Sequence, residues 1–124
     1  MIYLWIFIGS GLGGMLRYLT SVTMQKLINP GIFPIGTFCV NMIGCLLIGF
    51  IAQLSEARAV FAPEMRIFLM IGILGGFTTF SSFGYETVQL IRDGEFLLAL
   101  GNAGGQLILG LIMVYLGYVL ARLI

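Results

Sequence analysis

Residues 75–83 read GGFTTFSSF and put side chains capable of chemistry inside an otherwise apolar segment. Two adjacent glycines and four hydroxyl residues lie here in a stretch without charge between Arg66 and Glu86. That stretch is about long enough to cross a bilayer, at roughly 20 residues per crossing. Lipid cannot satisfy a free N–H or C=O group, so irregular backbone at membrane depth must be buried in protein or line a wet cavity. The run therefore indicates a site.

Further polar residues interrupt the other apolar segments. Thr37, Asn41 and Gly44 recur at i, i+4 and i+7, which puts them on one helical face. Asn102 and Gln106 stand one helical turn apart in the last segment. Each costs free energy in a membrane unless it faces the protein interior. The Asn41 amide offers two hydrogen-bond donors, which suit an anion or a backbone carbonyl, and interhelical hydrogen bonding is the alternative role for each of these residues.

Two ionisable side chains fall within apolar segments. An arginine at a helix centre costs about 3 kcal/mol on insertion scales, but Arg17 lies near enough to a helix end to reach the interface. Anchoring at the interface and attraction of anions to a vestibule are both open roles for Arg17. Deep in an anion pathway an ionised carboxylate would be repulsive, so Glu86 is expected at the mouth of a pathway or paired.

The composition identifies an integral membrane protein. Of the 124 residues 60% are hydrophobic and 9% charged, and the mean hydropathy is +1.10, whereas a soluble protein is about 25% charged. The gaps between charged residues predict an all-α fold, a single transmembrane domain over residues 1–124, with spans at about 2–25, 34–54, 67–91 and 96–121. The chain starts without the basic segment of a signal peptide, and no cleavage site follows the first apolar stretch. The first helix is therefore expected to be retained.

Several function classes are excluded by what the chain lacks. It has no histidine, no Cys/His cluster and no P-loop, and no catalytic constellation can be assembled, so an enzyme is not predicted. A net charge of +1 argues against a nucleic-acid partner. Cys39 and Cys45 lie six residues apart within one span and are interpreted as small apolar packing residues.

The basic residues of the loops specify the orientation of the chain in the membrane only weakly. Four spans place Arg58, Arg66 and Arg122 on one side and Lys26 and Arg92 on the other, whereas the positive-inside rule needs a clear excess. A chain that inserts both ways can pair with an inverted copy of itself, and four helices alone enclose little, so a homo-oligomer is expected. Small-xxx-small pairs predict close helix contacts at Gly9 and Gly13, Gly72 and Gly76, and Gly101 and Gly105.

Three runs carry a family resemblance. GGMLRY at 13–18, GTFCVNMIG at 36–44, and GGFTTFSSF at 75–83 followed by Glu86-Thr87-Val88 resemble the Fluc (CrcB) fluoride channels, and the resemblance covers essentially the whole chain in order. It implies an antiparallel, dual-topology homodimer with two fluoride pores. It also implies a structural sodium ion (Na+) at the dimer centre, held at a broken third helix.

The resemblance assigns roles by position. Phe80 and Phe83 match the pore phenylalanines, Asn41 the pore asparagine, and the carbonyls of Gly75 and Thr78 the sodium ligands. A benzene ring has a positive edge that fluoride can approach, but ring edges alone cannot replace a hydration shell. The remaining pore residues are therefore sought among donors, namely Thr37, Thr79, Ser81, Ser82, Asn102 and Gln106.

Two departures from the family pattern concern polar positions. Ser82 stands where a threonine is common, which keeps the hydroxyl group. In the last span the family's tyrosine and small hydroxyl residues are replaced by Asn102, Gln106 and Gly110. The chemistry of that polar track is therefore particular to this chain.

As a function, the resemblance implies passive export of fluoride from the cytoplasm, which limits fluoride toxicity, by a multi-pass protein of the cell inner (plasma) membrane. A small multidrug-resistance-type exporter has the same size and span number, but it needs an acidic residue in the first span, where this chain has Arg17. A non-transporting membrane scaffold is the other alternative. It would explain the glycines but not the polar residues within the spans.

Overall fold

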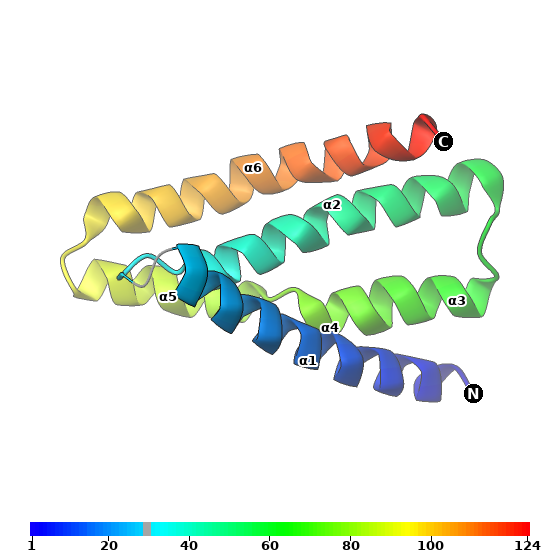
Figure 1. Cartoon of the computed structure of the whole chain (residues 1–124), viewed down its shortest axis with the longest axis horizontal. Helices are drawn as coiled ribbons and strands as arrows, with labels where there is room; N and C mark the ends of the chain where they lie inside the picture. Colours follow the sequence, from blue (N-terminus) through cyan, green and yellow to red (C-terminus); the bar gives the residue numbers. More distant parts are fainter. Residues whose placement is uncertain (29–30) are drawn as a thin grey trace.

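The computed structural model describes residues 1–28 and 31–124, and within them the chain is helical with no strand (Figure 1). Four of its helical segments are long and apolar enough to cross a membrane, namely Ile2–Ile28, Ile35–Arg58, Pro63–Arg92 and Phe96–Arg122. The predicted class, an all-α membrane protein with four spans, is confirmed.

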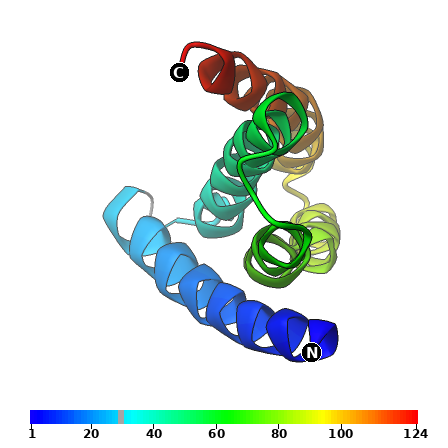
Figure 2. The same ribbon diagram turned by 90° about the vertical axis from the view of Figure 1, so that its right-hand side faces the viewer.

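Three of these segments are uninterrupted helices: α1 (Ile2–Ile28), α2 (Ile35–Arg58) and α6 (Phe96–Arg122). The third segment is composite and consists in order of α3 (Pro63–Ile67), the π-helix η1 (Phe68–Leu74), α4 (Gly75–Phe77) and α5 (Phe80–Arg92). Helices α2 and α6 run side by side and make the most extensive contact, and α1 packs across η1, α4 and α2 (Figures 1 and 2). The third segment thus has α1 on one side and α2 on another.

Helix α1 approaches η1 and α4 through glycine. A Cβ atom built on Gly9 would lie only 2.8 Å from the Gly72 Cα atom. A Cβ on Gly13 would overlap the Ile73 carbonyl oxygen. Small residues allow this close approach of two backbones in a membrane. The contact predicted for the glycine pairs of the first and third spans is confirmed.

The glycine pair predicted in the last span is only half correct. A Cβ on Gly105 would meet the Phe38 ring at 3.0 Å, but one on Gly101 would find nothing within 4 Å. Helices α2 and α6 instead approach most closely at Gly49 and Gly117, where an added Cβ would overlap a carbonyl oxygen of the other helix. The four-residue spacing of Gly101 and Gly105 therefore did not identify the face of α6 that packs against α2.

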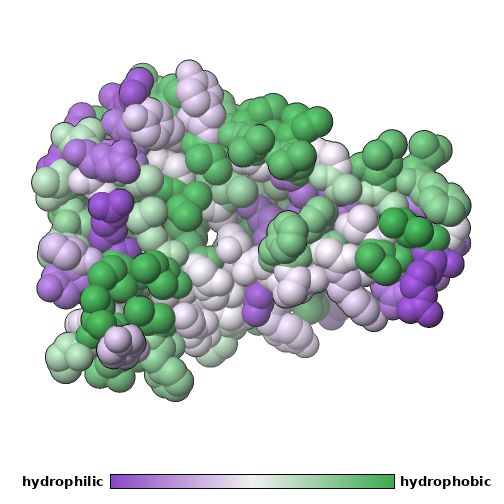
Figure 3. Space-filling model, turned by 180° about the vertical axis from the view of Figure 1, so that it is seen from behind, coloured by the Kyte–Doolittle hydropathy of each residue, from purple (hydrophilic) through white to green (hydrophobic). Residues whose placement is uncertain are grey.

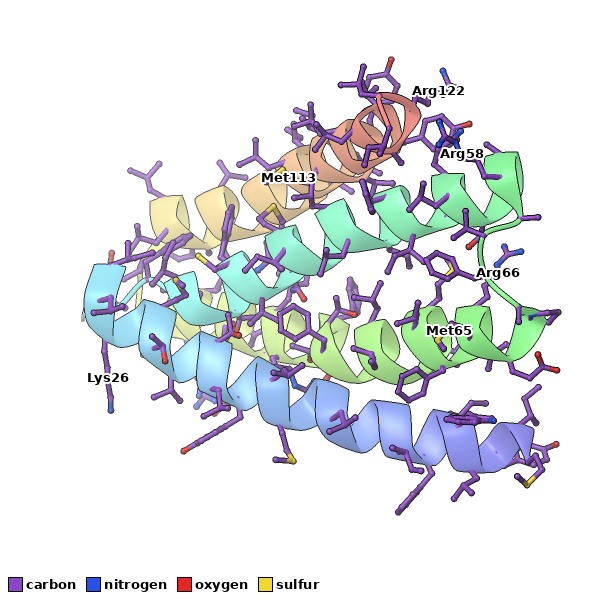
Figure 4. All side chains as sticks on the ribbon, turned by 45° about the vertical axis from the view of Figure 1, so that its right-hand side comes forward. Lys26, Arg58, Met65, Arg66, Met113 and Arg122 are labelled. Carbon is purple, nitrogen blue, oxygen red and sulfur yellow. The ribbon has the colours of Figure 1, made fainter. Side chains whose placement is uncertain are left out.

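The surface agrees with a membrane environment. On the face seen in Figure 3, hydrophilic residues gather towards the two ends of the elongated molecule, and the surface between them is mostly hydrophobic or neutral. Arg58, Arg66 and Arg122 lie at one end and Lys26 at the other (Figure 4). Both chain termini also lie at the end that holds the three arginines (Figure 1). The expected separation of Arg58, Arg66 and Arg122 from Lys26 is confirmed.

Two residues with extended backbone separate α4 from α5. Thr78 has φ −82° and ψ 160°, and Thr79 has φ −152° and ψ 116°. The Thr78 N–H still donates to the Leu74 carbonyl at 3.0 Å, so the helical ladder ends there. Helix α5 begins at Phe80, and the Thr79 hydroxyl oxygen caps it by accepting a hydrogen bond from the Ser82 N–H at 3.1 Å. The interruption lies within the run 75–83.

Candidate functional site

Asn41 on α2 meets both main-chain groups of Thr79 at the interruption. The Thr79 N–H donates to Asn41 Oδ1 at 2.9 Å, and Asn41 Nδ2 donates to the Thr79 carbonyl at 3.0 Å. Thr79 is only 8% exposed, so water or lipid contributes little to its hydrogen bonding. Buried main-chain groups in a membrane must be satisfied within the protein. One carboxamide therefore makes the extended backbone at this depth possible.

The same contact leaves carbonyl groups available next to the interruption. In a continuous helix the Thr79 N–H would donate to the carbonyl of Gly75, four residues earlier, but it donates to Asn41 instead. Gly75 is exposed. The Thr78 carbonyl accepts a hydrogen bond from Arg17 Nη1 on α1 at 3.4 Å. Arg17 is partly buried and its side chain reaches the interruption.

A chain of hydrogen bonds continues from Asn41 into α6 and returns to α5. Asn41 Nδ2 also donates to Gln106 Oε1 at 2.7 Å, and Gln106 Nε2 donates to Asn102 Oδ1 at 3.0 Å. Asn102 Nδ2 donates to Thr87 Oγ1 at 2.9 Å, and the Thr87 hydroxyl donates to the Phe83 carbonyl at 2.7 Å. Side chains from α2, α6 and α5 thus form one network.

Sequence reasoning did not single out Thr87 as a site residue. In the network just described, the Thr87 hydroxyl accepts from the Asn102 amide and donates to the Phe83 carbonyl. It is the point at which this network joins α6 to α5. One available signal was its position directly after Glu86, in a segment whose polar residues all needed partners. What the sequence could not show is that α6 lies beside α5 at this depth.

Glu86 lies beside Thr37 of α2. The Thr37 hydroxyl donates to Glu86 Oε1 at 2.6 Å. The other carboxylate oxygen, Oε2, is buried and has no hydrogen-bond partner in the described part of the chain. A Cβ on Gly44 would overlap the Thr78 side-chain methyl group. Thr37, Asn41 and Gly44, which were predicted to share one face of α2, all contact the third segment.

Aromatic and hydroxyl groups gather at the start of α5. The rings of Phe80 and Phe83 have centroids 5.4 Å apart and are tilted by 52°. The Phe80 side chain is 83% exposed in the single chain. The Thr79 hydroxyl lies 3.3 Å from that of Ser81 and 3.1 Å from that of Ser82. Ring edges and hydroxyl groups are therefore close together at one turn.

An open cavity of about 450 Å³ lies between α2, α6 and the third segment. Of the predicted fluoride-pore residues, its lining brings together Asn41, Thr79, Phe80, Phe83 and Gln106. The two predicted sodium ligands, Gly75 and Thr78, also line it. The predicted site residues outside the lining are Thr37, Ser81, Ser82, Asn102, Arg17 and Glu86.

Charged metal ligands do not cluster in the described part of the chain, where no group of three His, Cys, Asp or Glu residues could hold a metal ion. Cys39 and Cys45 are free thiols. Unwound main-chain carbonyls hold cations in other broken-helix membrane proteins, and the interruption contains carbonyl groups of this kind.

The fold and the site define a multi-pass membrane protein in which polar side chains of several helices meet at an interruption of the third segment. Residues 4–118 match the family described as CrcB-like protein, Camphor Resistance (CrcB), and the chain belongs to this family.

Relatives of the chain carry a functional name. It is 44% identical, over 98% of its length and 96% of the relative, to a protein of Maridesulfovibrio salexigens named fluoride-specific ion channel FluC. Proteins with the same name from Helicobacter pylori (strain J99) and Methylocella silvestris are 42% and 46% identical, over 98% of this chain and 94% and 93% of the relatives. The family resemblance read from the three sequence runs is confirmed.

Proposed function

We propose that this chain forms a fluoride-selective ion channel through which fluoride leaves the cytoplasm passively. The observation that carries the proposal is the cavity whose lining includes Phe80, Phe83, Asn41 and Gln106. The relatives named fluoride-specific ion channels, which match nearly the whole chain, support the same function.

The chemistry of the cavity suits a small anion. Fluoride is strongly hydrated, so a dry pathway must replace its water shell with fixed donors, as selectivity filters do. Amide N–H groups supply strong donors, and aromatic edges supply a weaker positive potential within an apolar wall. Fluoride that enters a cell as HF ionises inside, so an open anion-selective pore lets it leave down its electrochemical gradient. No energy source is required.

We propose further that two copies pair in antiparallel orientation. The wall of the cavity that belongs to α6 includes Leu107 and Leu111, which are 65% and 66% exposed in the single chain. An apolar wall that is open on one side is suited to burial against a second copy. The nearly even basic charge at the two ends of the molecule favours insertion in both orientations.

A structural sodium ion would fit the carbonyl groups at the interruption. The Gly75 carbonyl lacks its helical donor because the Thr79 N–H donates to Asn41. The Thr78 carbonyl accepts from Arg17 at 3.4 Å, but a carbonyl oxygen has two lone pairs and can also face a cation. One chain offers two such oxygens, and an inverted second copy would supply two more. A sodium ion bound there would place a positive charge between the two copies.

The function is tested in proteoliposomes loaded with fluoride or chloride salts. We expect fluoride release while chloride stays trapped. Phe80→Ile and Phe83→Ile should each slow fluoride release strongly, whereas Phe96→Ile, at an exposed position outside the cavity, should not. Chloride leakage at a comparable rate would refute a fluoride-selective channel. Normal release in both cavity variants would remove the two rings from the pathway.

The dimer orientation is tested by crosslinking single cysteines in a background in which Cys39 and Cys45 are replaced by alanine. Val60→Cys and Asp93→Cys lie in the connections at opposite ends of the molecule. Antiparallel partners bring a Val60→Cys chain and an Asp93→Cys chain together at one membrane face. Crosslinks only between identical variants would show a parallel dimer instead.

The sodium ion is tested by preparing the protein with potassium or N-methylglucamine as the only cation. We expect slower fluoride release and a lower thermal midpoint than in sodium. Gly75 and Thr78 contribute carbonyl groups, so side-chain substitution would not remove the ligands directly. Equal flux and equal midpoints in all three cations would argue against a sodium site.

A further inference from the structure

Helix α2 begins without a side-chain cap from its own segment. Its N-cap residue is Pro34, whose side chain makes no hydrogen bond to the helix. The first N–H groups of an α-helix have no acceptor within the helix. Here the Gly36 N–H donates to Gln25 Oε1 at 3.1 Å. Because Gln25 lies on α1, a side chain of the first span caps the second span.

The nitrogen of the same amide holds the connection between α1 and α2. Gln25 Nε2 donates to the Phe33 carbonyl at 3.0 Å and to the Gly31 carbonyl at 3.3 Å. A main-chain N–H only donates and a carbonyl only accepts, so these partners fix the orientation of the amide. A Cβ atom on Gly36 would overlap the carbonyl oxygen of Ser21, which lies one turn before Gln25. One face of α1 therefore fixes the start of α2.

Three consecutive residues in the first turn of α2 contact three different helices. Gly36 contacts α1. The hydroxyl of Thr37 donates to Glu86 Oε1 on α5 at 2.6 Å. The ring of Phe38 lies against α6, where a Cβ atom on Gly105 would meet it at 3.0 Å. Successive residues of an α-helix point in directions about 100° apart, so a small rotation of this turn would disturb all three contacts together.

Glu86 depends on this turn for the hydrogen bond that its carboxyl group makes. Oε1 accepts from Thr37, whereas Oε2 is buried and has no partner in the residues that the structure describes. A buried polar group that loses its hydrogen bond carries a desolvation penalty. If Thr37 moved away, the carboxyl group of Glu86 would therefore be driven towards a wetter position.

We propose that Gln25 is a positioning residue, which caps α2 from α1 and thereby holds Thr37 against Glu86. Gln25 does not line the cavity. Its effect on fluoride release is indirect, because a carboxylate that is free to turn towards an anion pathway would repel the anion. This part of the inference rests on the proposed fluoride channel, whereas the capping and its effect on Glu86 do not.

The positioning role is tested without any flux measurement, by the carboxyl ¹³C signal of Glu86 in detergent-solubilised protein with ¹³C-labelled glutamate. The signal is assigned by its loss in Glu86→Gln. Gln25→Met removes the cap at similar side-chain length and should shift or broaden the Glu86 signal. Gln25→Glu keeps an oxygen for the Gly36 N–H and should leave the signal nearer to its wild-type position. Gln53→Met, the same substitution near the other end of α2, is the matched control and should leave it unchanged. An unchanged Glu86 signal in Gln25→Met would overturn the positioning role.

The effect on the pathway is tested by fluoride release from proteoliposomes. Gln25→Met should slow release by up to about fivefold, which corresponds to the loss of one hydrogen bond of about 1 kcal/mol. Thr37→Val removes the donor to Glu86 and should slow release by a similar factor. If Gln25 acts through Thr37, Gln25→Met should have little further effect in the Thr37→Val background. Gln53→Met should release fluoride at the wild-type rate.

The outcomes separate this inference from the proposed function. Fluoride release at the wild-type rate in Gln25→Met would refute the effect on the pathway and leave the channel function in place. Multiplied losses in the double variant would refute the link through Thr37. If the wild-type protein released no fluoride, the proposed function and the effect on the pathway would both fail, and the carboxyl signal would still decide whether Gln25 positions Thr37 against Glu86.

Discussion

Replacement of Asn41 by leucine should destabilise the fold because it leaves main-chain groups of the interruption unpaired. Leucine has the same branched skeleton as asparagine but offers neither donor nor acceptor. The Thr79 N–H and carbonyl would lose their partners at 2.9 and 3.0 Å, in a residue that is 8% exposed. Gln106 would lose the donor to its oxygen as well.

The magnitude follows from the count of unpaired groups. A buried polar group that loses its partner costs about 1 to 3 kcal/mol, so the two groups of Thr79 together cost about 2 to 6 kcal/mol. Averages for interhelical hydrogen bonds in a membrane are smaller, about 0.6 kcal/mol each, and three such bonds give about 2 kcal/mol. The two estimates meet at about 2 kcal/mol, and we expect Asn41→Leu to lower the free energy of unfolding by at least this amount.

The assay is unfolding by dodecyl sulfate in mixed micelles, followed by far-ultraviolet circular dichroism and compared with Gln106→Leu. The control variant removes two hydrogen bonds, those of Gln106 with Asn41 and with Asn102, but leaves both main-chain groups of Thr79 paired. At about 0.6 kcal/mol per bond it should therefore cost about 1 kcal/mol. If Asn41→Leu were no more destabilising than Gln106→Leu, Asn41 would not be the partner on which the extended backbone depends.

Two further pairs of variants probe the packing of α1 and the start of α5. Gly13→Val would drive a side chain into the Ile73 carbonyl and should lower the thermal midpoint clearly, while Gly11→Val, where nothing lies within 4 Å, should leave it nearly unchanged. Thr79→Ala removes the hydroxyl that accepts from the Ser82 N–H and should cost about 1 kcal/mol in the same unfolding assay, whereas Thr79→Ser should cost much less. Equal losses for alanine and serine would argue against capping.

The positions of the spans could be predicted because charge is costly in lipid. The apolar stretches between charged residues locate four helical segments without any knowledge of packing. The polar face of α2 could also be predicted, since a helical period of 3.6 residues puts Thr37 and Asn41 on one side. These features depend on local sequence and on the solvent alone.

The partners of the polar residues could not be predicted in the same way. Periodicity gives the face of a helix but not the neighbour that this face meets, which depends on how all the helices pack. Asn41 was expected to donate to an anion or to a backbone carbonyl, and the structure directs its amide nitrogen at the Thr79 carbonyl and at Gln106, a partner that no local pattern indicated. The contact of Arg17 with the Thr78 carbonyl joins residues 61 positions apart and has no signal in either local sequence.

The shortness of the interruption has an electrostatic consequence. Helical structure ends at Phe77 and resumes at Phe80, so the C-terminal end of one helical stretch and the N-terminal end of α5 are separated by only two residues. The dipole of the first presents partial negative charge at its carbonyls, and the dipole of α5 presents partial positive charge at its N–H groups. A single break therefore creates two poles of opposite sign at nearly one depth in the membrane. Charges of opposite sign are therefore favoured on its two sides, and at the negative pole the Arg17 guanidinium donates to the Thr78 carbonyl.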